Sequence, residues 1–153
     1  MGKKSIKENK TKYQIARENL GLTRAEASEL TGYTESQLER IENRKLKVIP
    51  PEDALNLSKA YKDHSICNYY CTHDCEIGKQ TMHEVKEKEI SQIAVETLTT
   101  LNQLNQKRDR LLEIIADGVI TEDEEADFQM IKDTLDRIVD AAAEMKLWYE
   151  KVK

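Results

Sequence analysis

The sequence is poor in the residues that interrupt helices. It holds five glycines and two prolines in 153 residues, and only 5% of its residues are aromatic. Charged residues, by contrast, make up 35%. Strands favour aromatic residues, and turns favour glycine and proline, so a chain with few of either is not typical of a sheet protein. The composition predicts an all-α protein with a well solvated surface.

Long apolar runs are absent as well. No stretch approaches the roughly 20 apolar residues that a membrane-spanning helix needs. The N-terminal MGKKSIKENKTKYQ has lysines but no apolar segment after them, so it matches neither a signal peptide nor a transit peptide. We therefore expect a cytoplasmic protein without a membrane segment.

Motifs of catalysis are also absent. The sequence contains no phosphate-binding glycine loop, no H-E-x-x-H motif and no nucleophile motif with a paired histidine. We therefore expect that the protein is not an enzyme.

Charge is divided unevenly along the chain. Residues 1–65 hold 13 Lys and Arg against 10 Asp and Glu, whereas residues 66–153 hold 11 against 19, for a net charge of −5. A basic first half and an acidic second half indicate different partners. Residues 1–12 carry five lysines and one glutamate. Such a basic, flexible arm either contacts phosphates or is a solvated tail.

Residues 13–65 carry the caps of several short helices. Thr23 with Glu26, and Thr34 with Gln37, each match the capping box that begins a helix. A glycine ends the first of these two helices, and the sequence TGYT joins it to the second. The pair predicts a helix-turn-helix unit in a DNA-binding domain.

The second helix of such a unit lies in the major groove of double-stranded DNA, and its side chains meet base edges. Arginine can recognise guanine, a carboxylate accepts from cytosine N4, and a hydroxyl serves either way. The candidate base-reading residues are Glu35, Ser36 and Arg40. The candidate contacts to the DNA backbone are Arg24, Asn43, Arg44, Lys45 and Lys47.

The stretch GLTRAEASELTGYTESQLERIEN resembles the helix-turn-helix of Xre/Cro, or phage-repressor-like, regulators. The residues that carry this resemblance are Leu22-Thr23, Ala27, Leu30, Gly32, Leu38 and Ile41-Glu42. The resemblance implies the same base-reading positions and a phosphate contact at Arg24. It also implies a buried, structural ion pair between Arg17 and Glu42. Where these regulators usually have glycine after the second helix, this chain has Asn43, which tolerates the left-handed conformation expected there.

Apolar residues recur at three- and four-residue spacing over residues 83–153. They predict one helix over 83–116 and a second over 122–151, folded back as an antiparallel hairpin. In the second helix the apolar residues form a heptad seam, whose members are Phe128, Ile131, Leu135, Ile138, Ala142, Met145, Tyr149 and Val152. Because two helices cannot bury this seam alone, we expect residues 83–153 to form a homodimer; the alternative is packing on the N-terminal domain.

A cysteine-rich connector, residues 66–82, lies between these parts. Cys67, Cys71 and Cys75 are four residues apart, and His73 lies in the last gap. On a helix these thiols share one face, and with His73 they offer ligands for zinc or an iron–sulfur cluster. Zinc knuckles and common cluster motifs do not use this spacing, and cysteine also packs well among apolar neighbours without a ligand. Both a metal or redox role and a structural role therefore remain open. An odd number of cysteines in a reducing compartment argues against a disulfide framework.

The order of these parts extends the resemblance. A helix-turn-helix, then CNYYC with a later C-x-I-G, then a hairpin ending near LWYE is similar to a group of small Xre-type regulators. The sequence thus predicts a repressor-like helix-turn-helix bundle followed by a long antiparallel helical hairpin. The expected function is sequence-specific DNA binding by a homodimeric transcriptional regulator.

A second function comes from a different class of protein. Here the acidic hairpin, residues 83–153, binds and inhibits another protein, as in conflicts between phage and host. The acidic charge of the second half favours this alternative, as do Glu35 and Glu39, which direct two carboxylates toward the DNA.

Overall fold

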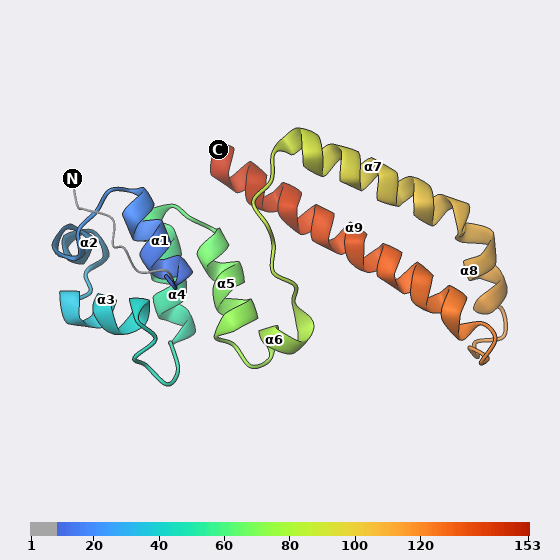
Figure 1. The fold of residues 1–153 in the computed structure, drawn as a ribbon, viewed down its shortest axis with the longest axis horizontal. Coiled ribbons are helices and arrows are strands. Elements are labelled where there is room, and N and C mark those ends of the chain that lie inside the picture. The colour runs from blue at the N-terminus through green and yellow to red at the C-terminus, as the bar shows by residue number, and fades with distance from the viewer. Residues whose placement is uncertain (1–8) are drawn as a thin grey trace. The chain divides into compact units, whose positions relative to one another are not determined.

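The computed structural model describes residues 9–153, and this part of the chain is helical, without strands. The chain divides into two compact units, residues 1–84 and 85–153. The first unit contains α1 (Lys12–Asn19), α2 (Arg24–Thr31), α3 (Glu35–Glu42), α4 (Pro51–Tyr61), α5 (Ser65–His73) and α6 (Gly78–Thr81). The second contains α7 (Ile90–Gln106), α8 (Arg108–Ile114) and α9 (Glu125–Val152) (Figure 1). The all-α expectation is confirmed. Most of the basic arm expected at residues 1–12 lies outside the described residues.

The two helices of the helix-turn-helix begin where the sequence places their caps. Thr23 Oγ1 accepts from the Glu26 backbone N–H at 3.2 Å, and the Glu26 carboxylate accepts from the Thr23 N–H at 2.7 Å. Thr34 and Gln37 repeat this exchange at 3.2 and 2.8 Å. Both capping boxes are therefore confirmed. Gly32 ends α2 with a φ of 76°, a conformation that glycine adopts without steric cost.

The core of the first unit draws on five helices and the loop before α4. Its buried members are Tyr13, Ala16, Ala27, Leu38, Ile41, Ile49, Ala54, Leu57, Tyr61 and Ile66. Leu30, one of the residues that carry the resemblance, lies in the last turn of α2 and is 52% exposed. The small Ala27 is the only fully buried residue of α2, which lets this short helix approach its neighbours closely.

The segment treated above as a connector is mostly helical: α5 runs to His73 and α6 covers Gly78–Thr81, whereas residues 74–77 form a turn between them. Ile66, in the first turn of α5, is fully buried in the core, and Tyr69 and Tyr70 pack against it. The next helix, α6, approaches α5 so closely that a Cβ atom on Gly78 would lie 2.1 Å from the carbonyl oxygen of Cys71. Glycine is required at this contact because no side chain fits there. Cys67 and Cys71 lie on α5, whereas Cys75 lies in the turn between α5 and α6, so the three thiols do not share one helix face.

The helices of the second unit differ in extent from those expected. The single helix expected over 83–116 is wrong in two places. Residues 83–89 are not helical. The sequence HEVKEKE has no apolar face, so packing against a neighbour cannot stabilise a helix there. The helix also breaks at Lys107, whose N–H bonds to the carbonyl of Leu104, three residues back. By contrast, α9 is one continuous helix of 28 residues that packs antiparallel to α7 (Figure 1).

Within the single chain, the long helix α9 buries a face that overlaps the heptad seam only at Ile131. Its buried residues are Ile131, Thr134, Ala141 and Glu144. Four positions of the seam, Leu135, Met145, Tyr149 and Val152, are 39% to 57% exposed in the single chain, so their burial against a second copy stays a prediction. Apolar residues at helical spacing occupy two adjacent stripes of this helix, and only packing against α7 selects the stripe that faces inward.

No helix among residues 9–153 has both the length and the apolar character that crossing a membrane requires.

Candidate nucleic-acid interface

The second helix of the helix-turn-helix, α3, has one buried and one exposed side. Leu38 and Ile41 are each 1% exposed and fix α3 to the core. The candidate base-reading residues Glu35, Ser36 and Arg40 are all exposed on the outer side of this helix. The structure thus brings these three side chains together on a rigid element that solvent can reach.

The charges along α3 are only partly compensated within the unit. Glu39, one of the two carboxylates expected to face DNA, accepts from the ammonium group of Lys45 at 2.6 Å. The side chain of Arg40 makes no hydrogen bond or ion pair with another residue of the described range 9–153. The guanidinium of Arg40 is therefore available to an external partner, while part of the negative charge is neutralised.

Glu42 is the last residue of α3, and its carboxylate links three helices through bonds from α1 and α2. Arg17 of α1 donates to it through Nε at 2.5 Å and through Nη2 at 3.0 Å. Arg24 of α2 donates to it through Nε at 2.9 Å. The side chain of Glu42 is 2% exposed, and the hydrogen bond to this carboxylate raises the pKa of Arg17. The Arg24 side chain, a candidate phosphate contact, is 34% exposed despite its ion pair.

The turn after α3 differs from expectation. Asn43 has a φ of −99°, so it does not take the left-handed conformation expected of it. Its side-chain amide donates to the carbonyl of Glu39 at 2.9 Å, which holds Asn43 close to the helix. The left-handed residue is Arg44, with a φ of 52°. The change of direction is thus delayed by one residue.

Arg44 is held by an aromatic side chain of α5. Its guanidinium donates to the hydroxyl of Tyr69 and lies 5.8 Å from the centre of that ring. Tyr69 in turn stacks on the imidazole of His73, with ring centres 4.2 Å apart. It also meets Tyr13 of α1 edge-on at 5.5 Å. This contact sets the position of the loop that follows α3.

Tyr13 ties α1 to the end of α5. Its hydroxyl donates to the carboxylate of Asp74 at 2.8 Å. Burial, with a smaller contribution from this hydrogen bond, raises the pKa of Tyr13. α5 is therefore joined to two other segments: Asp74, just after its end, accepts a hydrogen bond from α1, and Tyr69 accepts one from the loop after α3.

The cysteines do not assemble with His73 as a metal centre. All three thiols are free and half-buried. Within residues 9–153, no group of three His, Cys, Asp or Glu side chains is placed to hold a metal ion. Burial and the neighbouring thiols of Cys75 and Cys67 raise the pKa of Cys71, which disfavours the thiolate that binds metal. The zinc and iron–sulfur interpretations therefore have no support in the described structure.

Sequence reasoning missed the link between Arg44 and Tyr69. The sequence indicates Arg44 as a candidate phosphate contact and assigns no role to Tyr69. The two residues are 25 positions apart, and no periodicity or cap connects them. A left-handed arginine after a reading helix carries no local signal, since arginine is not a residue that favours this conformation.

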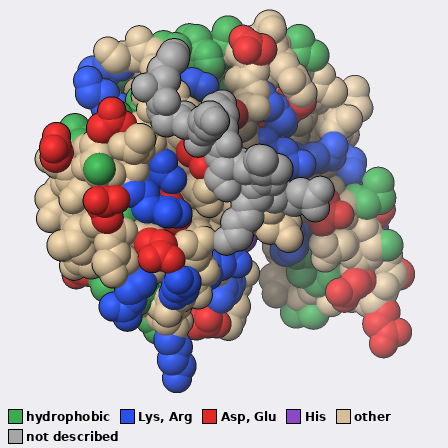
Figure 2. All heavy atoms as spheres, turned by 60° about the vertical axis from the view of Figure 1, so that its left-hand side comes forward, with side chains coloured by type: hydrophobic (Ala, Val, Ile, Leu, Met, Phe, Trp, Pro, Cys, Tyr) green, Lys and Arg blue, Asp and Glu red, His purple; other side chains and the backbone are tan. Residues whose placement is uncertain are grey.

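The surface of the first unit carries charges of both signs. On the face drawn in Figure 2, Lys and Arg side chains alternate with Asp and Glu side chains rather than forming one basic field. Lys47, the remaining candidate phosphate contact, is exposed in the loop after α3. On this face, attraction to phosphates would therefore come from individual cations rather than from a uniform potential.

Comparison with known proteins agrees with this geometry. Residues 14–62 match the family model of a helix-turn-helix domain. This match covers α2, α3 and α4 and most of α1. It indicates a DNA-binding regulator, and domains of this kind are typically not catalytic. No match was found among curated proteins or among solved structures.

Proposed function

We propose that the protein is a cytoplasmic, homodimeric regulator of transcription that binds a specific DNA sequence with α3 in the major groove. One observation carries this proposal. The helix α3 exposes Glu35, Ser36 and Arg40 on one side, while Leu38 and Ile41 lock its other side into the core. A rigid helix with exposed side chains of this chemistry is what reading of base edges requires.

The placement of cations around α3 supports the same proposal. Lys47 is exposed in the following loop, and Arg44 is exposed while Tyr69 orients it. The ion pair with Lys45 offsets the charge of Glu39, one of the two carboxylates that would repel DNA phosphates. Phosphate contacts of this kind set the register of a protein on DNA, whereas the α3 side chains supply sequence preference.

The exposed apolar surface of the hairpin supports dimerisation. Its buried apolar residues are few, namely Ile93, Ile114, Ile131 and Ala141. Large apolar residues left exposed include Val95, Leu98, Leu101, Leu112, Ile115, Leu135, Val139 and Tyr149. On α9, Leu135, Val139, Ala142 and Tyr149 follow heptad spacing on one exposed stripe. A second copy offers the same stripe, and a two-fold dimer would present two reading helices to two half-sites.

The test measures binding by fluorescence anisotropy. Labelled DNA from the region upstream of the protein's own gene is compared with a scrambled duplex, at low and at moderate salt. We expect a preference for the native sequence that survives moderate salt. Replacement of Arg40 by alanine should weaken specific binding by about 1–3 kcal/mol, which is roughly fivefold to 150-fold.

A matched control distinguishes base reading from loss of charge. Lys59→Ala removes an exposed cation from α4, away from the reading helix, and should leave the preference unchanged. Equal binding to both duplexes that disappears with salt would refute sequence-specific recognition. That outcome would favour the alternative, in which the acidic hairpin binds another protein.

A further inference from the structure

Two of the three cysteines lie on either side of the end of α5. Cys71 is two residues before this end at His73, and Cys75 is in the turn that follows. The turn folds back over the helix, because the N–H groups of Asp74 and Cys75 both donate to the carbonyl of Tyr70, at 2.8 and 3.0 Å. Cys75 therefore stays beside the last turn of α5, which holds Cys71.

Gly78, the first residue of α6, contacts both cysteines. Its N–H donates to Sγ of Cys75 at 3.5 Å. A Cβ atom on Gly78 would lie 2.1 Å from the carbonyl oxygen of Cys71 and 3.0 Å from its Cα. Burial raises the pKa of Cys71, and the thiol of Cys75 raises it further, by more than that of Cys67 does. Cys71 and Cys75 are therefore close neighbours.

Cys67 and Cys71 are less suited to form a bond with each other. Both lie inside α5, four residues apart. At this spacing the Cβ atoms of a helix are about 5–6 Å apart, whereas a disulfide requires about 3.5–4.5 Å. The fully buried Ile66 anchors α5 in the core, so the helix resists unwinding. The turn that carries Cys75 has no helical restraint of this kind.

Cys75 is also open to a small reagent. It lines a hollow of about 480 Å³ between the loop after α3 and the end of α5. Lys47 and Val48 line the hollow from the loop, and Tyr70 and Ile77 line it from the opposite side. The hollow therefore has room for a small molecule attached to the sulfur of Cys75.

We propose that Cys71 and Cys75 form a reversible disulfide when the protein meets a low-molecular-weight disulfide. The sulfur of Cys75 attacks one sulfur of this reagent and releases one thiol, which leaves a mixed disulfide on Cys75. The sulfur of Cys71 then attacks Sγ of Cys75 and releases the second thiol. The two cysteine thiols lose two protons and two electrons, and the small disulfide gains both and becomes two thiols. In a reducing compartment such bonds are transient and serve catalysis or redox sensing.

The new bond would act on a residue proposed to contact DNA. His73 and Asp74 lie between the two cysteines in the chain. His73 stacks on Tyr69, whose hydroxyl accepts a hydrogen bond from Arg44. Asp74 accepts a hydrogen bond from Tyr13 at 2.8 Å. A shift of the turn toward α5 would disturb this group and release Arg44, so we expect weaker DNA binding. This effect rests on the function proposed above, whereas the disulfide itself does not.

Mass spectrometry of the full-length protein locates the bond. The protein is equilibrated in buffers of glutathione and glutathione disulfide, from reducing to oxidising, and free thiols are then blocked with N-ethylmaleimide. Trypsin cleaves after Lys62 and Lys79, so one peptide, residues 63–79, holds all three cysteines. We expect this peptide to lose two hydrogen atoms and to carry a single N-ethylmaleimide group, on Cys67. Excess glutathione should reverse the change.

Four results would overturn the disulfide. The first is a bond between Cys67 and Cys71, and the second is a bond between two copies of the chain. The third is glutathione attached to Cys75 that never gives way to a bond with Cys71. The fourth is free thiols at both Cys71 and Cys75 in the most oxidising buffer.

Single serine variants provide matched controls, because each removes one thiol from the same segment. Cys67→Ser should form the bond as the parent protein does. Cys71→Ser should stop at the mixed disulfide on Cys75. Cys75→Ser should form no intramolecular bond, and such a bond in this variant would contradict the assignment. Circular dichroism checks that the variants are folded, and the result on the parent protein does not depend on them.

The anisotropy assay described above then compares reduced and oxidised protein. Oxidation should weaken DNA binding about threefold, the effect of losing one surface ion contact, and excess glutathione should restore it. Cys75→Ser given the same treatment should bind equally before and after. A mapped bond without a change in DNA affinity would refute the coupling to Arg44. A reduced protein without sequence preference would refute the proposed function, while mass spectrometry still decides the disulfide.

Discussion

Arg17 and Glu42, on the first and third helices of the helix-turn-helix bundle, form a bidentate ion pair at 2.5 and 3.0 Å. The two side chains are only 8% and 2% exposed. Such a pair contributes less to stability than its short distances suggest, because both charges lost their hydration on burial. Its importance lies in what happens when one partner is removed.

Replacement of Arg17 by methionine should destabilise the protein by about 3–5 kcal/mol, because the buried carboxylate of Glu42 loses its main partner. Arg24 keeps one bond to Glu42, which places the loss toward the lower end of this range. Urea unfolding followed by circular dichroism measures the effect. The double variant Arg17→Met/Glu42→Leu should recover most of the loss. If Arg17→Met alone unfolds like the parent protein, the pair has no structural role.

The buried hydroxyl of Tyr61 predicts a dependence on alkaline pH. Burial raises the pKa of Tyr61 to about 12, whereas an unfolded tyrosine titrates near 10. The stability contributed by this group is therefore fully present below about pH 10 and is lost as the pH rises to about 12. The loss amounts to roughly 2–3 kcal/mol. Denaturant unfolding at pH 8, 10 and 11 would detect it.

Tyr61→Phe provides the control for this pH dependence. The Tyr61 hydroxyl has no hydrogen-bond partner within residues 9–153, so its removal should not destabilise the protein at neutral pH. The variant should lose less stability than the parent protein between pH 10 and 12. Tyr13, whose pKa burial also raises, contributes equally to both proteins and cancels in the comparison. An identical alkaline loss in both would contradict the assignment to Tyr61.

The close contact between α5 and α6 should not tolerate a side chain. Gly78→Ala places a Cβ atom 2.1 Å from the backbone oxygen of Cys71, and backbone cannot move aside as a flexible side chain would. We expect a loss of about 1–3 kcal/mol, measured by thermal or urea unfolding. Lys79→Ala, at the next and exposed position, should change stability by less than about 0.5 kcal/mol. Equal stability of the two variants would show that α6 is not packed on α5.

The exposed apolar stripe of α9 should mediate self-association. Val139 is 65% exposed in the single chain. Val139→Lys would place a charge in the proposed dimer interface and should shift the protein from dimer to monomer in sedimentation equilibrium. Asp133→Lys adds the same side chain on the polar side of α9 and should remain dimeric. A parent protein that sediments as a monomer at all concentrations would refute the dimer.

The sequence by itself determined the helical class and the helix-turn-helix. Few glycines and prolines, two capping boxes and a glycine between them are local signals, and each acts through the backbone of its own helix. In the structure Thr23 and Thr34 therefore cap the starts of α2 and α3, and Gly32 ends α2, as the sequence predicts. The exposed positions of Glu35, Ser36 and Arg40 follow from the same periodicity, once Leu38 and Ile41 point inward.

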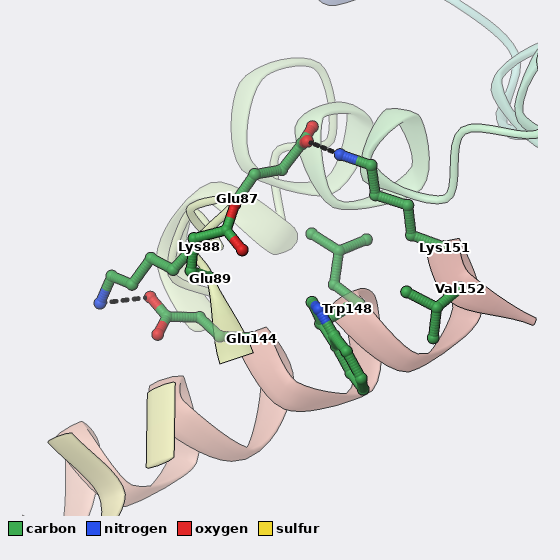
Figure 3. Close-up of a pocket in the computed structure, with 8 residues that line it drawn as sticks. Glu87, Lys88, Glu89, Glu144, Trp148, Lys151 and Val152 are labelled. Atoms are coloured by element: carbon green, nitrogen blue, oxygen red, sulfur yellow. Dashed lines mark hydrogen bonds and ion pairs between the residues drawn. The ribbon is translucent and has the colours of Figure 1, made fainter. Parts of the chain in front are cut away.

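The tertiary structure alone decided contacts between distant segments. Apolar spacing on α9 fits two stripes, and packing against α7 selected the stripe of Ile131 and Ala141. The hold of Tyr69 on Arg44, and the ion pair of Lys88 with the buried Glu144 (Figure 3), likewise join residues that lie far apart in the chain. Local sequence carries no record of such pairs, because a buried charge meets its partner only when separate segments come together.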